Sequence, residues 1–124
     1  MDTISQKISD SELEVMRVLW EAGAALPITE IRQTLQERKG WEATTVKTLV
    51  QRLVTKGVLS QEKRKVFYYR PLVTEAEYSN WAAMDLVSRL FRGSAKELVA
   101  TLVKSEGLSA EDIDELRELF QVEE

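Results

Sequence analysis

The strongest constraint on the fold of this 124-residue chain is a set of four helix-start signals spread along it. Each signal is a Ser or Thr followed three residues later by an acid, and in this capping box each side chain accepts a hydrogen bond from a backbone N–H at the helix start. The four pairs are Ser9 with Glu12, Thr74 with Glu77, Ser94 with Glu97, and Ser109 with Asp112. The glycines that stand where helices should stop are Gly23, Gly57, Gly93 and Gly107. The chain is therefore expected to be mainly α-helical.

Apolar residues at spacings of three and four predict six helices. The second begins near 27–29 and reaches about residue 38, and the others cover about residues 10–22, 43–56, 75–92, 95–105 and 110–121. Two short strands are predicted near 58–62 and 66–70, because the second, "VFYYR", is rich in the β-branched and aromatic residues that strands favour. Three helices followed by a hairpin make the winged helix-turn-helix plan, in which the third helix enters the DNA major groove. The predicted fold is thus mainly α with a small β-hairpin: a winged helix-turn-helix domain over residues 1–72 and a three-helix dimerisation region over residues 73–124.

Cysteine and histidine are both absent, and their absence excludes several functions. The chain can form no disulfide, no thiolate nucleophile, no Cys/His metal site and no Ser-His-Asp triad. It contains no phosphate-binding glycine loop, and its acids fall in helix caps and on helix surfaces rather than in a cluster. We therefore expect a protein that is not an enzyme and that needs no metal or cofactor.

Two features predict the location of the protein. The stretch "MDTISQKISD" lacks the basic start and the apolar core of a signal peptide. No apolar run approaches the roughly 20 residues that a membrane span requires. We expect a cytoplasmic protein with no membrane partner.

The net charge of −4 is unevenly distributed. Residues 1–72 hold 12 Lys and Arg against 9 Asp and Glu, whereas residues 73–124 hold 5 against 12. Within residues 41–72 there are 7 basic residues and 2 acidic ones. Such asymmetry indicates a nucleic-acid surface joined to a part with another role, although charge alone leaves open a chance imbalance in a short window.

The segment "WEATTVKTLVQRLVTKG", residues 41–57, predicts one amphipathic helix. Its Leu and Val residues crowd into an arc of roughly 140°. The opposite side carries two cations and no acid, whereas solvated helix faces usually mix Glu with Lys. A phosphate could bind at the helix start, and an arginine suits bidentate contact with guanine. The predicted DNA contacts are Thr44, Thr45, Lys47, Thr48 and Arg52, with a solvated helix face as the alternative. Trp41, before the helix, is expected to pack beneath its first turn.

Three consecutive cations, Lys63, Arg64 and Lys65, lie between the two predicted strands. Phosphate contacts there would release counterions and make the affinity fall steeply with salt. A basic turn alone is commonly just solvated, so the prediction depends on its position one hairpin after the DNA-facing helix. The tip has no glycine, and we expect a short, stiff wing.

The three C-terminal helices carry apolar stripes at helical spacing, in a segment too small to close its own core. We predict that these stripes pack against a second copy of the chain, so that a two-fold dimer presents two DNA-facing helices to a pseudo-palindromic site. Folding back onto the chain's own winged domain is the alternative. The predicted dimer contacts are Tyr78, Trp81, Leu86, Leu90, Leu98, Leu102, Ile113, Leu116 and Phe120.

Three segments, "ISDSELEVMRVLW", "WEATTVKTLVQRLVTKG" and "VFYYRPLV", resemble the penicillinase-repressor family of transcriptional regulators, the BlaI/MecI/CopY type. The resemblance extends from about Ile8 to Phe120. It implies a homodimeric repressor whose N-terminal winged helix binds operators of dyad symmetry and whose C-terminal helices form an intertwined dimer. It also implies DNA contacts at the same five residues of the third helix and at the wing 63–65.

The sequence departs from the family at the positions that receive a signal. Antibiotic-responsive members are inactivated by proteolysis at an Asn-Phe bond, and the matching position here is Thr101-Leu102. Copper-responsive members carry a C-terminal Cys-x-Cys pair, whereas this chain ends "LFQVEE". Glu42 stands where a Ser cap commonly precedes the third helix, and Glu is a poorer cap. A protease or another sensor acting on the C-terminal half stays open as a partner.

Two functional hypotheses follow from the sequence. The first is a homodimeric, sequence-specific repressor with two partners, a double-stranded operator and a second copy of itself. The second is a winged-helix module that binds protein and no specific DNA, because a fold does not fix a function. Salt dependence separates the two, since phosphate contacts give a steep dependence of affinity on salt.

Overall fold

The computed structural model describes residues 8–122. By packing, the chain divides into two compact units, Met1–Ala82 and Ala83–Glu124. This division concerns packing alone, so the functional boundary that we place at residue 72 stays a prediction.

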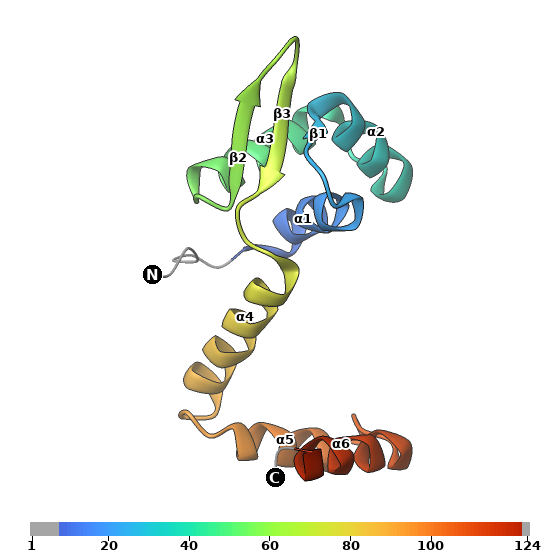
Figure 1. Ribbon diagram of the computed structural model, residues 1–124, viewed down its shortest axis with the longest axis vertical. Helices are drawn as coiled ribbons and strands as arrows, with labels where there is room; N and C mark the ends of the chain where they lie inside the picture. Colours follow the sequence, from blue (N-terminus) through green and yellow to red (C-terminus); the bar gives the residue numbers. More distant parts are fainter. Residues whose placement is uncertain (1–7, 123–124) are drawn as a thin grey trace. The chain divides into compact units, whose positions relative to one another are not determined.

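Three helices form the body of the first unit (Figure 1): α1 (Asp10–Ala22), α2 (Ile28–Lys39) and α3 (Ala43–Thr55). The predicted capping box starts α1, where Glu12 N–H donates to Ser9 Oγ at 3.1 Å and Ser9 N–H donates to Glu12 Oε1 at 2.9 Å. Both α1 and α2 end at a glycine in the left-handed region, Gly23 and Gly40, which glycine adopts without strain. The bounds of all three helices agree with the prediction to within one residue.

The first unit also contains a three-stranded antiparallel sheet in the order β1-β3-β2. The strands β2 (Leu59–Lys63) and β3 (Phe67–Pro71) form the predicted hairpin, shifted by one residue. The third strand, β1 (Leu26–Pro27), pairs with β3 opposite Tyr69 and Tyr68. The predicted two-stranded hairpin is therefore incomplete, because a strand of two residues, one of them proline, is too short to show any periodicity.

The core of the first unit includes the apolar side of α3. Val46, Leu49, Val50 and Leu53 are each at most 5 % exposed, as the periodicity predicts. Trp41 also packs against this core, as expected. Because α3 is held by its apolar side, its opposite side is fixed in a single direction.

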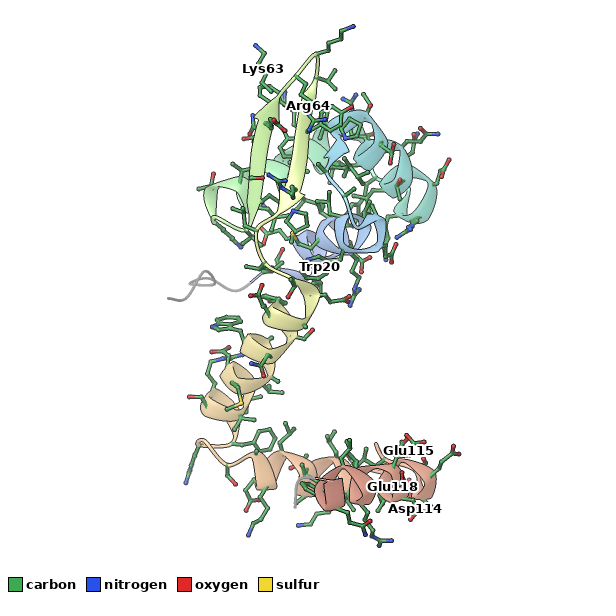
Figure 2. The ribbon with its side chains drawn as sticks, viewed as in Figure 1. Trp20, Lys63, Arg64, Asp114, Glu115 and Glu118 are labelled. Carbon is green, nitrogen blue, oxygen red and sulfur yellow. The ribbon has the colours of Figure 1, made fainter. Side chains whose placement is uncertain are left out.

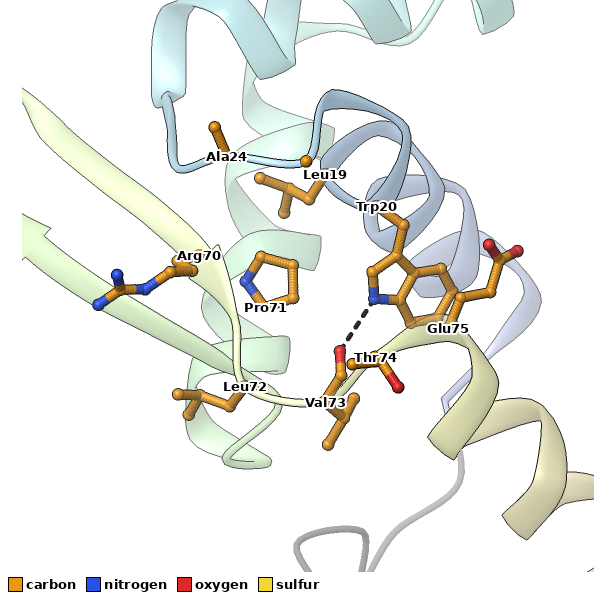
Figure 3. A pocket seen from close by; sticks show the side chains of 10 residues that line it. Leu19, Trp20, Ala24, Arg70, Pro71, Leu72, Val73, Thr74 and Glu75 are labelled. Atoms are coloured by element: carbon orange, nitrogen blue, oxygen red, sulfur yellow. Dashed lines mark hydrogen bonds between the residues drawn. The ribbon is translucent and has the colours of Figure 1, made fainter.

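The fourth helix, α4 (Glu75–Leu90), begins in the first unit, to which its residues 75–82 belong. Tyr78 is only 7 % exposed, and its ring centroid lies 6.4 Å from that of Trp20 and 5.8 Å from that of Trp81. Trp20 Nε1 also donates to the Val73 carbonyl at 3.0 Å, just before α4 begins (Figure 3). The structure buries Tyr78 in the core of one chain instead of leaving it for the predicted dimer interface, because Trp20 on α1 supplies an aromatic partner that the helical spacing of residues 75–92 does not reveal. Trp81 packs beside Tyr78 but stays half-buried.

The second unit contains the rest of α4, with α5 (Ala95–Lys104) and α6 (Ala110–Val122). The capping box of α6 is complete, since the Ser109 and Asp112 pair exchanges two hydrogen bonds of 3.0 Å. That of α5 is half formed: Ser94 Oγ accepts from Glu97 N–H, but Ser94 N–H donates to the Phe91 carbonyl. Within residues 8–122, no helix is both long enough and apolar enough to cross a membrane.

Apolar side chains of the second unit remain largely exposed. Among its described residues, Val87 is the single hydrophobic residue that is buried. The large hydrophobic residues that stay exposed are Met84, Leu90, Val99, Leu102, Val103, Leu119 and Phe120. The unit therefore lacks a closed core of its own within the part of the chain that the structure describes.

Candidate nucleic-acid interface

The predicted DNA-facing side of α3 is exposed along its whole length. All five predicted residues lie on the surface, whereas Val46, Leu49 and Val50 between them in sequence are buried in the core. No Asp or Glu occurs between Ala43 and Thr55. The side opposite the core is therefore basic and hydroxyl-rich, as the sequence predicts.

Three of these residues surround a single hollow of the surface. Lys47, Thr48 and Arg52 line a shallow groove of about 490 Å³, together with Gln51, Thr55 and Lys56. Thr44 and Thr45 lie one turn earlier, in the first turn of α3. The groove thus joins cations and hydroxyls on one face, which is the composition that phosphate oxygens and base edges require.

The start of α3 has no side-chain cap. Glu42 occupies the N-cap position with extended backbone angles, but its carboxylate accepts no hydrogen bond from the first turn. The first backbone bond of the helix runs from Val46 N–H to the Glu42 carbonyl at 3.1 Å. Because no side chain caps them, the N–H groups of Ala43, Thr44 and Thr45 point out of a helix end with positive dipole character, which suits an anion.

The hydroxyl of Thr48 is engaged within the helix. Thr48 Oγ1 donates to the Thr44 carbonyl at 3.0 Å, so its proton is not available to a base. Its methyl group and the acceptor capacity of its oxygen remain, and a methyl group suits contact with thymine. The structure thus narrows the predicted role of Thr48 to that of an apolar contact or an acceptor.

Gln51 lies on the polar side of α3 but outside the predicted site. Its side chain hydrogen-bonds with the phenol of Tyr69 on β3. Burial raises the pKa of Tyr69, and this hydrogen bond offsets part of that rise. Gln51 on α3 thus interacts with a residue of the sheet, which no spacing within 41–57 could have indicated.

The three wing cations lie at the tip of the β2–β3 hairpin, where Figure 2 labels Lys63 and Arg64. Lys63 ends β2, and the tip is closed by a hydrogen bond from Arg64 N–H to the Val66 carbonyl at 3.0 Å. All three cations are exposed. The wing is short, as the absence of glycine predicts.

Arg64 is held in place by two neighbours that the sequence did not indicate. Its Nη2 and Nε lie 3.0 and 3.2 Å from Glu62 Oε1, and its guanidinium carbon lies 4.2 Å from the ring centroid of Tyr68. The acid and the ring together fix a flexible side chain, because a planar guanidinium both stacks and pairs. Glu62 therefore competes with any phosphate that approaches Arg64.

The described residues contain no group of three or more Asp and Glu placed to hold a metal ion. The site thus consists of one helix face and one hairpin tip, both basic. A sequence model of the penicillinase repressor family matches residues 8–122 of the chain. The chain belongs to the penicillinase repressor family. The resemblance of the three quoted segments is thereby confirmed.

Two curated relatives illustrate the match to the penicillinase repressor family. The "Penicillinase repressor" of Bacillus licheniformis is 31% identical over 116 residues, which cover 93% of this chain and 90% of the relative. The "Methicillin resistance regulatory protein MecI" of Staphylococcus aureus strain N315 is 32% identical over 121 residues, which cover 97% of this chain and 98% of the relative. The similarity thus includes both units of the chain.

Two solved structures of the penicillinase repressor family resemble the chain. The DNA-binding domain of the repressor BlaI in solution has a TM-score of 0.55 and 38% identity, and covers 63% of this chain and 94% of its own. The monomeric form of Bacillus licheniformis BlaI in complex with the blaP half-operator has a TM-score of 0.52 and 36% identity, and covers 59% of this chain and 89% of its own. The winged-helix fold class is confirmed.

Proposed function

We propose that this protein is a transcriptional repressor that binds double-stranded operator DNA as a homodimer. The side of α3 formed by Thr44, Thr45, Lys47, Thr48 and Arg52 would read the major groove, and the wing cations Lys63, Arg64 and Lys65 would contact the backbone. The mechanism is steric and not enzymatic, because an occupied operator that overlaps a promoter excludes polymerase.

One observation carries the proposal. The acid-free side of α3 is exposed while its apolar side is buried, so the basic and hydroxyl groups have one fixed direction. The same geometry of a helix fixed on a small core is what DNA recognition in the major groove requires. The two structural relatives are a DNA-binding domain and a complex with a half-operator, which supports the same function for this chain.

The dimer is supported by the apolar surface of the second unit. Exposed hydrophobic residues such as Leu102 and Phe120 cost free energy in water and are stabilised by a partner. The remaining predicted contacts, Leu86, Leu98, Ile113 and Leu116, are half-buried in one chain and can be covered fully by a second. We retain all the predicted contacts, the half-buried Trp81 included, except Tyr78, which is already buried within one chain.

The signal that releases the protein from its operator would act on the second unit. The Thr101-Leu102 position is exposed on α5, so a protease or another sensor could reach it after local unfolding of the helix. The side chain of Thr101 donates to the Glu97 carbonyl at 2.9 Å, which holds this segment helical until it opens.

The decisive experiment is selection of genomic DNA fragments by the purified full-length protein at two salt concentrations, followed by sequencing of the retained DNA. We expect one inverted-repeat motif and an affinity that falls about a thousandfold or more between 50 and 200 mM salt. Retention without a motif would reduce α3 to a non-specific basic surface. No retention at either concentration would favour the protein-interaction module.

A further inference from the structure

A buried carboxylate lies outside the DNA interface of the first unit. Glu12 is 2 % exposed and is the single polar or charged residue buried among residues 8–122. Its Oε1 accepts hydrogen bonds from Ser9 N–H at 2.9 Å and from Lys56 Nζ at 2.6 Å. A buried charge is tolerated only when it is paired and hydrogen-bonded, so this contact constrains both of its partners.

Lys56 connects the carboxylate to the DNA-facing helix. It is the C-cap residue of α3, and its backbone N–H donates to the Arg52 carbonyl at 2.9 Å. The ammonium group thus fixes the C-terminal end of α3 to the N-terminal end of α1. Arg52, the predicted guanine contact, lies one turn before this attachment.

Tyr78 connects the other side of the same segment to α4. Its hydroxyl accepts a hydrogen bond from Ile8 N–H at 3.2 Å and donates to the Ile8 carbonyl at 3.4 Å, and both bonds are buried. Ile8 directly precedes Ser9, the cap whose N–H binds Glu12. A continuous chain of bonds, which we call the Glu12 bridge, therefore runs from Tyr78 through residues 8–12 to Lys56.

The Glu12 bridge is fully satisfied. No buried side-chain polar atom among the described residues lacks a hydrogen-bond partner. Buried networks in which every member is bonded are rigid, whereas removing one member loosens the rest. The bridge should therefore hold the first turns of α4 and the C-terminal end of α3 in a fixed relative position.

We propose that Glu12 and Tyr78 are positioning residues for DNA reading, which fix the C-terminal end of α3 to the first turns of α4 through the Glu12 bridge. The proposal rests on the proposed function of α3 as the DNA-reading helix. Base-edge hydrogen bonds require donor–acceptor distances of about 2.7–3.2 Å, so a shift of α3 by about 1 Å weakens them. Loosening the first turns of α4 therefore weakens operator binding although no DNA-contacting residue has changed.

The variants that test the Glu12 bridge remove one interaction each. Glu12→Gln keeps an acceptor for Ser9 N–H and removes the charge that pairs with Lys56. Tyr78→Phe removes the hydroxyl and keeps the ring beside Trp20. Glu21→Gln is the matched control, because it removes an exposed carboxylate that pairs with Arg38 at 2.7 Å, outside the bridge.

The first readout is a ratio of two affinities of the full-length protein at one salt concentration: its affinity for the selected inverted-repeat DNA divided by its affinity for a scrambled duplex. Glu12→Gln and Tyr78→Phe are each expected to lower the ratio about tenfold, and the double variant no more than the stronger single one, because members of one network are not additive. Glu21→Gln should keep the ratio of the unaltered protein. An equal loss of affinity for both duplexes would indicate only a smaller folded fraction and would overturn the proposal. A double variant whose reduction of the ratio equals the product of the two single reductions would overturn it as well.

The second readout needs no DNA. Amide hydrogen exchange at Lys56, Gly57 and Val58 is expected to become about tenfold faster in both Glu12→Gln and Tyr78→Phe, because these amides belong to the end of α3 that the bridge holds. Unchanged exchange in Tyr78→Phe would overturn the bridge. If the unaltered protein selects no DNA motif, the proposed function fails, and the exchange rates still decide whether the bridge exists.

Discussion

At the scale of single residues, Glu12 links the packing of the first unit to pH. Burial raises the pKa of its carboxyl group, but the hydrogen bond and charge of Lys56 and the hydrogen bonds from Ser9 outweigh this effect and hold the pKa below that of an ordinary glutamate. Because the pKa is lower in the folded state, the contribution of Glu12 to stability is fully present above the unfolded-state pKa. It is lost as the pH falls through the folded-state pKa.

Glu12→Gln should therefore destabilise the protein at neutral pH and much less in acid. We expect a loss of about 2–3 kcal/mol at pH 7, slightly less than the range of about 3–5 kcal/mol for breaking a fully buried pair, because Lys56 keeps 20% exposure. The free energy of unfolding from urea titrations between pH 7 and about pH 3 measures this difference. A difference in the free energy of unfolding between variant and unaltered protein that stays constant across this range would contradict the lowered pKa of Glu12. Glu21→Gln should show no comparable gap.

Arg52 carries the sharpest residue-scale prediction for DNA. Arg52→Ala should cost roughly 1–3 kcal/mol in binding the selected motif and should relax the base preference at one position of each half-site, because a bidentate guanine contact is lost. Arg17→Ala removes the same charge from α1, where Arg17 pairs with Glu14, and serves as the control. If Arg52→Ala binds the motif and scrambled DNA as the unaltered protein does, the role of Arg52 is wrong.

At the scale of elements, the sequence predicts what is encoded locally and misses what depends on distant contacts. The predicted Ser and Thr caps, which act within one turn, mark the starts of α1, α4, α5 and α6 in the structure, whereas α2 and α3 begin without a side-chain cap. The strand β1 and the burial of Tyr78 depend on partners on β3 and on α1, far away in sequence. The interaction of Gln51 with Tyr69 and the ion pair of Glu62 with Arg64 likewise join residues that no periodicity connects.

The ion pair between Glu62 and Arg64 leads to a prediction about the wing. Glu62→Gln should strengthen binding to any duplex by about threefold to tenfold, because a neutral amide competes less with phosphate for Arg64. The dependence of log affinity on log salt should also steepen by up to about one unit. Fluorescence anisotropy over a salt series measures both effects. Glu118→Gln on α6, labelled in Figure 2, removes the same charge elsewhere and should change neither. A weaker affinity in Glu62→Gln would show that Glu62 orders Arg64 for DNA rather than competing with it.

At the scale of the whole molecule, the two units differ in what they leave on the surface. The described part of the first unit exposes cations and hydroxyls along α3 and the wing, whereas that of the second exposes apolar side chains on α4, α5 and α6 and acids such as Asp114, Glu115 and Glu118. The charge counts predict this contrast because net charge needs no knowledge of the fold. The sequence left open which copy covers the apolar stripes, since periodicity marks a buried face and not its partner.

Phe120 provides the test of the dimer. It is 73 % exposed, so Phe120→Glu should leave each chain folded but should place a charge in the proposed interface. We expect Phe120→Glu to be a monomer in sedimentation equilibrium. Its affinity for the full inverted repeat should fall by about a hundredfold while its affinity for a half-site stays unchanged, because two half-sites are bound more tightly than one only when a dimer links two DNA-binding domains. Gln121→Glu adds the same charge at the neighbouring exposed position and should remain dimeric. A dimeric Phe120→Glu with full operator affinity would place the interface elsewhere, and it would then follow that the exposed stripe of α6 serves another partner.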